Sequence, residues 1–176
     1  WMFKVRDHFE SFLDTQAILP LQFIKTQKEG SYEDTDFVLF NYQLKKYFSK
    51  KGSQEMPLDI QDVLSVAYYA RTLDVKDKPI GTEFLLNVYL DNEIHALKFR
   101  IDGYETLKTD VGKIKTIRVI PEVIGGRVFK DKDALKVWVS NDDNKLPVRL
   151  QADIMVGSIK VDITKYSGLM HGLNFK

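Results

Sequence analysis

The sequence predicts a mostly β protein, in which a single antiparallel, strongly curved sheet or incomplete barrel of about ten strands carries one amphipathic helix packed on it. Apolar residues recur with period two through most of the chain, as they do in half-buried strands. Clusters of Gly, Asn and Asp separate these alternating segments, as turn residues do. Only residues 58–73 change to a helical period, whereas a parallel doubly wound fold would need many more helices.

Three alternating segments precede the predicted helix. The first carries apolar residues on one side at Phe3, Val5, Phe9 and Leu13. The second covers 19–28, and Gly30 with the acidic residues after it separates this segment from the third. The third segment, 37–48, is the longest, and one of its faces consists of Val38, Phe40, Tyr42 and Leu44. We therefore expect three strands in this part of the chain.

Residues 58–73 form the one predicted helix. Asp59 is a suitable N-cap, and Asp62 three residues later is placed to complete a capping box. The apolar stripe of this helix consists of Ile60, Val63, Leu64, Ala67 and Tyr68. Burying four or five such side chains contributes about 1.5–3 kcal/mol each before entropy is counted, so we expect the helix to pack on the sheet.

Seven further alternating segments follow the helix. They cover 84–90, 97–101, 104–109, 113–120, 134–140, 148–155 and 158–166. The first of them is apolar on both sides, which indicates a strand covered by the helix. The last two alternate regularly between polar and apolar residues. We expect their dry face to consist of Val148, Leu150, Ala152, Ile154, Ile159 and Val161.

Length and charge limit the classes of protein to consider. The 176 residues match one domain, which we place at 1–176. Lys and Arg together number 26 and Asp and Glu 25, so the chain lacks the basic excess of nucleic-acid binders. No apolar run approaches the roughly 18 residues that a transmembrane helix requires. The chain has no Cys, which excludes disulfides and thiolate metal sites.

Catalytic and metal-binding motifs are weak. His8, His95 and His171 lie far apart in the sequence without Cys partners, so zinc-type spacing is absent. Residues 141–144, Asn-Asp-Asp-Asn, are rich in oxygen ligands, but predicted strands flank them, so we interpret them as a hairpin turn. We expect no catalytic residue, no metal site and no cofactor, although folding could still assemble a triad from distant residues.

Aromatic residues are the best candidates for contacts with an apolar ligand. If Tyr68 points inward from the helix, Tyr69 and Arg71 lie toward its rim. Aromatic side chains on the strands could coat a concave face, although a filled core is their commoner use. The predicted ligand-binding residues are Phe40, Tyr42, Leu64, Tyr68, Tyr69, Arg71, Phe84, Phe99 and Trp138.

Four strings carry a resemblance to a known family: VWVSNDDNKLPVR at 137–149, DIQDVLS and YYAR within 59–71, and VGSIK at 156–160. They resemble the exported bacterial proteins of the domain of unknown function 3108 family. That resemblance implies a signal sequence and a longer N-terminus, so we expect a signal peptide and one or two strands before Trp1. It also implies the periplasm or cell envelope, and it implies no activity. A weaker similarity is to periplasmic lipoprotein carriers, which are incomplete antiparallel barrels closed by helices over an apolar concave face.

Two functions are compatible with these features. The first is an uncharacterised, non-enzymatic envelope protein that binds a lipid or another apolar ligand in the concave face of its sheet. The alternative is a structural or protein-interaction module of envelope assembly, with a filled core and no small ligand. Neither function involves nucleic acid or a transmembrane segment. An open apolar cavity would favour the first, and a solid interior the second.

Overall fold

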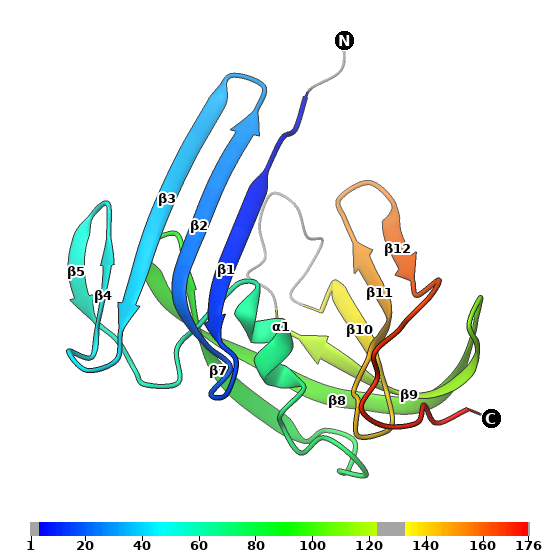
Figure 1. Ribbon diagram of the computed structural model, residues 1–176. Coiled ribbons are helices and arrows are strands. Elements are labelled where there is room, and N and C mark those ends of the chain that lie inside the picture. Colours follow the sequence, from blue (N-terminus) through cyan, green and yellow to red (C-terminus); the bar gives the residue numbers. More distant parts are fainter. Residues whose placement is uncertain (1–3, 123–132, 176) are drawn as a thin grey trace. The chain divides into compact units, whose positions relative to one another are not determined.

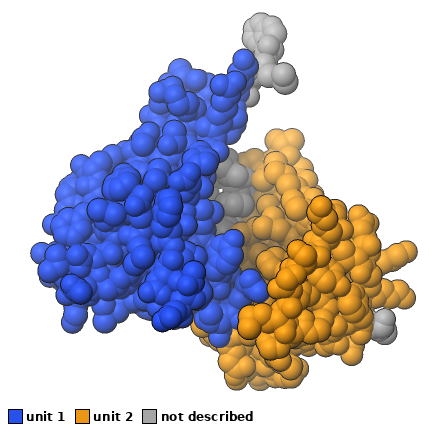
Figure 2. Space-filling model, viewed as in Figure 1, with its two compact units in different colours: residues 1–72, 86–96 blue, residues 73–85, 97–176 orange. Residues whose placement is uncertain are grey.

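The computed structural model describes residues 4–122 and 133–175. These residues form twelve β-strands and one α-helix, so the prediction of a mostly β protein is confirmed (Figure 1). They divide into two compact units, of which unit 1 consists of 1–72 and 86–96, and unit 2 of 73–85 and 97–176 (Figure 2). Trp1 and Phe3 lie outside the described residues. The assignment of 1–176 to one domain stays a prediction.

The strands belong to two open sheets, so the predicted single sheet is wrong. The first sheet is a five-stranded antiparallel meander of β1 (His8–Asp14), β2 (Leu19–Glu29), β3 (Tyr32–Asn41), β4 (Lys46–Ser49) and β5 (Gly52–Glu55). Met56 after β5 is buried in the core, and Pro57 has no N–H for a further ladder hydrogen bond. The strand β5 therefore does not continue into residue 57. Over the described ranges neither sheet closes into a barrel.

The second sheet has seven strands in the order β12-β11-β10-β9-β8-β7-β6. They are β6 (Gln61–Asp62), β7 (Glu83–Leu90), β8 (Glu93–Thr109), β9 (Gly112–Pro121), β10 (Leu135–Ser140), β11 (Pro147–Asp153) and β12 (Ser158–Asp162). The short β6 pairs in parallel with β7, with Gln61 opposite Val88 and Asp62 opposite Tyr89. The pairs formed by β8 to β12 are antiparallel. The division into units runs through β7 and β8.

The core of unit 1 is built on one face of the meander. Strand alternation directs Phe23, Val38, Phe40 and Tyr47 to this face, where each is at most 5% exposed. Tyr89 completes the cluster together with Met56 and Ile60. The ring of Tyr89 lies edge-on to the rings of Phe23, Phe40 and Tyr47, with centroid distances of 6.4, 5.8 and 5.0 Å. Such edge-to-face contacts stabilise aromatic clusters beyond the area they bury.

The helix is shorter than predicted and begins later. α1 spans Ser65–Ala70 and contacts β6 and β2 within unit 1. Its first turn is held by a reciprocal pair: Oδ1 of Asp62 accepts the N–H of Ser65 at 2.8 Å, and Oγ of Ser65 accepts the N–H of Asp62 at 2.7 Å. The pair has the reciprocal hydrogen bonds of a capping box, but it involves Asp62 and not Asp59, and the N-cap residue of α1 is Leu64. Asp59 instead accepts a hydrogen bond from the side chain of Asn87 at 3.0 Å.

The predicted inward stripe of the helix is partly wrong. Ile60 is fully buried, but it precedes the helix. Tyr68 is 56% exposed, and Ala67 is also exposed. The buried side chain of α1 is Ser65. Its hydroxyl oxygen accepts the N–H of Asp62, so the first turn of α1 contacts the buried residues through a polar group. The stripe predicted from a helix over 58–73 therefore has the wrong phase, because residues 61 and 62 are extended.

Unit 2 contains two apolar clusters. Leu107, Ile114, Trp138 and Val148 form one of them, and Val75, Ile101 and Ile117 form the other. Two register shifts occur in this sheet, between Ile101 and Gly103 on β8 and between Trp138 and Val139 on β10. Such bulges increase the local twist of a strand and redirect the side chains that follow.

The predicted dry face of the C-terminal strands is confirmed only in part. Val148 and Ala152 on β11 are buried. Ile159 and Val161 on β12 are 51% and 58% exposed, and Leu150 is 38% exposed, so the prediction is wrong for these residues. The cause is the position of β12, which pairs with β11 at the edge of the sheet. Alternation alone does not distinguish an edge strand from a central strand.

Candidate functional site

The five-stranded sheet carries apolar side chains on the face opposite its core. Phe12 pairs with Gln22, Gln22 with Leu39, and Leu39 with Phe48, so these four residues form one row across β1 to β4. Directly paired residues share a face of the sheet. In the next row, Ile24 pairs with Phe37. We name this surface the outer apolar face and define it as Phe12, Ile24, Phe37, Leu39 and Phe48.

Four of these side chains are well exposed to solvent. The exposed fractions are 51% for Phe12, 48% for Phe37, 43% for Leu39 and 38% for Phe48. A one-sided antiparallel strand normally carries polar residues on its wet face. β3 departs from this rule. Val38 and Phe40 fill the core, and Phe37 and Leu39 on the opposite face are apolar as well. Exposed apolar surface is often found at interaction sites.

Polar residues border the outer apolar face. Glu10 pairs with Ile24 at the β1 side, and the following row consists of His8, Thr26 and Thr35. His8 contacts Glu10 at 2.6 Å through its Nε2 atom. An apolar centre with a polar border is the composition found in protein–protein interfaces.

The opposite face of the sheet is anchored by a buried lysine. Nζ of Lys25 lies 2.9 Å from Asp34 and 2.5 Å from Asp91, and its side chain is only 5% exposed. Burial lowers the pKa of Lys25, but the hydrogen bonds to Asp91 and Asp34 outweigh it, so the pKa is raised overall. Hydrogen bonds from Lys50 and then Lys25 lower the pKa of Asp34 to about 2. These ion pairs hold β2, β3 and the β7–β8 turn together within unit 1.

A buried carboxylate also lies on β3. Asp36 is 2% exposed, and its Oδ2 accepts a hydrogen bond from the hydroxyl of Tyr89 at 2.7 Å. Its Oδ1 has no hydrogen-bond partner among the described residues. Burial and then the bond to Asp36 raise the pKa of the Tyr89 hydroxyl. This tyrosine therefore stays protonated and acts as a donor.

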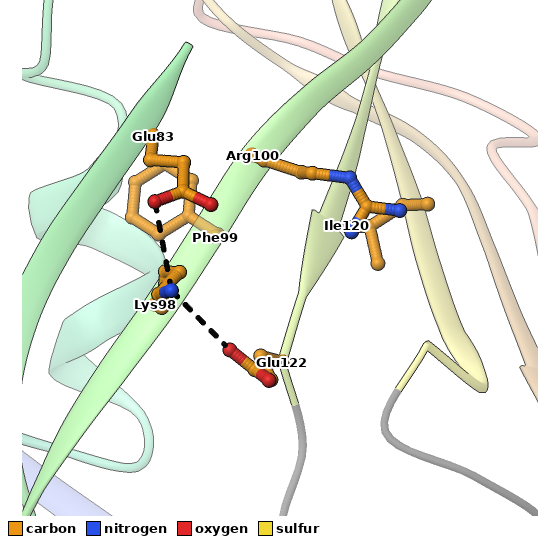
Figure 3. Close-up of a pocket in the computed structure, with 6 residues that line it drawn as sticks. All are labelled: Glu83, Lys98, Phe99, Arg100, Ile120 and Glu122. Carbon is orange, nitrogen blue, oxygen red and sulfur yellow. Dashed lines mark ion pairs between the residues drawn. The ribbon is translucent and has the colours of Figure 1, made fainter. Parts of the chain in front are cut away.

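Unit 2 has a small pocket between β7, β8 and β9 (Figure 3). Its volume is about 80 Å³, and it is lined by Glu83, Lys98, Phe99, Arg100, Ile120 and Glu122. Lys98 lies between the two glutamates, at 3.5 Å from Glu83 and 3.9 Å from Glu122. Arg100 pairs with Asp133 at 3.1 Å. Side chains of opposite charge that pair with one another line this pocket, so its lining does not favour a ligand of one particular charge.

The predicted ligand-binding residues are divided between the two units. Phe40 is buried in the core of unit 1 with Tyr42 beside it, and the hydroxyl of Tyr42 donates to the carbonyl of Pro20 at 2.8 Å. Phe84 and Phe99 stack at 5.2 Å in unit 2, where Phe99 lines the pocket. The remaining predicted residues lie at α1 and its ends or in a core: Leu64, Tyr68, Tyr69, Arg71 and Trp138. Their role in ligand binding stays a prediction.

The outer apolar face was missed by the sequence reasoning. Its signal is the string Phe37-Val38-Leu39-Phe40, which is apolar at both parities. A strand with one core face needs apolar residues at only every second position. The extra residues Phe37 and Leu39 were therefore visible in the sequence, but only Val38, Phe40, Tyr42 and Leu44 were assigned to a face of this strand.

The described part of the chain contains no helix of the length and apolar character needed to cross a bilayer. Within residues 4–122 and 133–175 no group of three His, Cys, Asp or Glu side chains is placed to hold a metal ion. Fold and surface together define a β-sheet protein of two open sheets, with compact cores and an apolar sheet face directed to solvent.

The family follows from a comparison of sequences. The profile described as "Protein of unknown function (DUF3108)" matches residues 1–164, so the chain belongs to this family and that resemblance is confirmed. No curated protein matches the chain. No solved structure matches it either, so the similarity to periplasmic lipoprotein carriers stays a prediction.

Proposed function

We propose that this protein is an exported, non-enzymatic protein of the cell envelope that acts as a protein-interaction module, with the outer apolar face as its binding surface. The observation that carries the proposal is the pair Phe37 and Leu39 on β3. Both are more than 40% exposed, although Val38 and Phe40 beside them already supply the core. Exposed aromatic and aliphatic side chains in adjacent strands provide the anchors that a protein partner buries.

The packing of unit 1 supports a protein partner over a small ligand. The meander's inner face is occupied by its own side chains, whereas a ligand site is normally a concave pocket of about 300–1,000 Å³. The pocket in unit 2 is about 80 Å³ and has a charged lining. Binding of a lipid or other apolar ligand stays a prediction, which mass spectrometry of a denatured extract of the purified protein would test. A stoichiometric acyl lipid in that extract would favour the lipid hypothesis.

Export is supported by membership of the DUF3108 family together with the signal sequence that the resemblance implies. Fractionation of cells that express the full-length gene tests this part of the proposal. The tagged protein is expected with periplasmic or envelope marker proteins. Its recovery with cytosolic markers would contradict export and leave the binding surface to be tested separately.

Site-specific photo-crosslinking tests the binding surface. A photoreactive residue at position 37 or 39 is expected to give a discrete protein adduct in intact cells. The matched control is position 32 on the same strand, because Tyr32 is 55% exposed and lies outside the outer apolar face. The Leu39→Ser substitution is expected to remove the adduct formed at position 37. Equal adducts at positions 32 and 37 would overturn the proposal.

A further inference from the structure

The hairpin of β11 and β12 lies at one edge of the sheet of unit 2, because β12 pairs with β11 and with no other strand among the described residues (Figure 1). Its turn follows the pair Asp153 and Ser158, and the N–H of Ile154 donates to the carbonyl of Gly157 across it at 3.1 Å. Gly157 has a φ of +89°, and a Cβ added there would meet no other part of the described chain within 4 Å. The turn therefore faces open space at this residue.

Apolar residues occupy the tip of this hairpin. Met155 is 65% exposed and Val156 is 88% exposed. Turns normally consist of Gly, Pro, Asn, Asp and Ser. The turns at 30–31, 50–51 and 91–92 carry Gly-Ser, Lys-Lys and Asp-Asn, and Val111 in the turn at 110–111 packs against an apolar cluster. Neither turn chemistry nor core packing therefore accounts for Met155 and Val156.

The apolar surface continues from the tip along one face of the hairpin. Leu150 pairs with Val161, and Ala152 pairs with Ile159, so these four residues share a face. Ala152 is buried, whereas the other three side chains are exposed. We name this surface the apolar hairpin and define it as Leu150, Met155, Val156, Ile159 and Val161.

The charges around the tip are compatible with an anionic surface. The segment 154–161 contains one charged residue, Lys160, and no carboxylate. The carboxylates that flank this segment are each paired with a cation: Asp153 with Lys136 at 3.2 Å, and Asp162 with Arg149 at 3.0 Å. The tip therefore presents apolar side chains and an exposed ammonium group, and its neighbouring carboxylates are compensated within the sheet.

The size of the apolar hairpin favours a lipid surface over a protein partner. A stable protein interface buries about 800 Å² on each partner and involves roughly 20–30 residues. The apolar hairpin has only five side chains, and two of them lie in a turn. A bilayer requires no matching shape, and apolar side chains enter its headgroup boundary to a depth of about 5–10 Å. The flexible side chain of Met155 adapts to such an irregular environment.

We propose that the tip of the β11–β12 hairpin docks on the surface of a lipid bilayer, with Met155 and Val156 inserted at the headgroup boundary. Lys160 then lies close to the lipid phosphates, which attract cationic side chains. Because few side chains are inserted, this binding is weak and reversible. The hairpin belongs to unit 2, so the inference does not depend on the outer apolar face, and it concerns a bilayer surface and not a single lipid held in a cavity.

Co-sedimentation of the full chain with vesicles of phosphatidylethanolamine and phosphatidylglycerol tests the proposal. The unsubstituted protein is expected to sediment with vesicles at millimolar lipid. The double variant Met155→Ser, Val156→Ser is expected to bind at least about tenfold more weakly, because it loses the inserted apolar side chains. The matched control is Ile80→Ser, since Ile80 is 66% exposed, lies in unit 2 and is outside the strands.

Two results of this experiment would overturn the proposal. The first is an unsubstituted protein that stays in the supernatant at millimolar lipid. The second is an equal loss of binding in Ile80→Ser and in the double variant, which would indicate adsorption without a defined contact. A concentration-dependent dimer that the double variant abolishes would identify a second copy as the occupant of the apolar hairpin, and would likewise overturn it. Circular dichroism verifies that each variant is folded.

Tryptophan quenching locates the contact directly. Val156→Trp places a reporter at the tip, and vesicles that contain brominated phospholipid are expected to quench its emission. Ile80→Trp is the control and is expected to be quenched no more than the unsubstituted protein, which supplies the background of Trp1 and Trp138. Equal quenching of the two reporters would contradict insertion of the tip.

Discussion

The hydroxyl of Tyr89 donates a 2.7 Å hydrogen bond to Oδ2 of Asp36 in the interior of unit 1. The other carboxylate oxygen has no partner among the described residues. Tyr89 is thus the donor that compensates a buried carboxylate, and it is also the ring on which Phe23, Phe40 and Tyr47 pack. One side chain therefore links the polar and apolar parts of this core.

Removal of this hydroxyl is expected to destabilise the protein. Tyr89→Phe keeps the ring contacts but leaves Asp36 without its donor, at a cost of about 1–3 kcal/mol in the free energy of unfolding. Urea denaturation measures the loss. Tyr104→Phe is the control, because the Tyr104 hydroxyl donates to the carbonyl of Lys78 and the residue is 39% exposed. Equal losses in the two variants would contradict this account.

The depressed pKa of Asp34 predicts sensitivity to acid. Its folded-state value of about 2 lies below the ordinary 3.8, because Lys50 and Lys25 donate to the carboxylate. A group with a lowered folded pKa stabilises the fold fully above its unfolded pKa. That contribution is lost as the pH falls from 3.8 through about 2. In thermal melts over this range, Asp34→Asn should lose less stability than the unsubstituted chain, and parallel losses would refute the assignment.

Substitution by alanine is expected to destabilise the protein at one phenylalanine of β3 and to have little effect at another. Phe40→Ala removes a buried ring and should cost about 3–5 kcal/mol in the free energy of unfolding. Phe37→Ala changes an exposed ring and should alter it by no more than about 0.5 kcal/mol. Chemical denaturation of both variants measures the difference. A large loss in Phe37→Ala would mean that the outer apolar face is covered within the folded chain.

The position of the capping box gives a test of the helix boundary. Asp62→Ala removes the acceptor for the first turn of α1 and the bond from Ser11 at 2.5 Å. The expected loss is about 0.5–2 kcal/mol, as for other N-cap substitutions. Asp59→Ala removes only the exposed bond to Asn87 and should cost less. A larger loss of unfolding free energy in Asp59→Ala than in Asp62→Ala would indicate that Asp59 caps the helix.

Local patterns predicted the strands better than they predicted the sheets. Alternation located Val38, Phe40 and Val148 correctly in cores, because each lies in a central strand with one covered face. The break between two sheets was not predicted, since the alternating period identifies single strands and does not say which strands pair.

The helix shows how a periodic pattern can select the wrong residues. Ile60 is buried as expected, but as part of an extended segment before the helix. Asp62 and Ser65 also match a capping box, and the sequence alone does not rank this box against one at Asp59. The outer apolar face was not predicted for a related reason. Aromatic residue type predicts burial, whereas tertiary packing decides which face of a sheet is left uncovered.

The edge strand β12 has a consequence for behaviour in concentrated solution. Ile159 and Val161 expose apolar side chains along β12, which pairs only with β11 among the described residues. An unpaired strand edge is a template for pairing with another chain. Lys160 lies between them, is itself exposed, and lies 3.5 Å from Asp162. Its ammonium group imposes a desolvation penalty on any chain that docks edge to edge, so it acts as a gatekeeper against fibril formation.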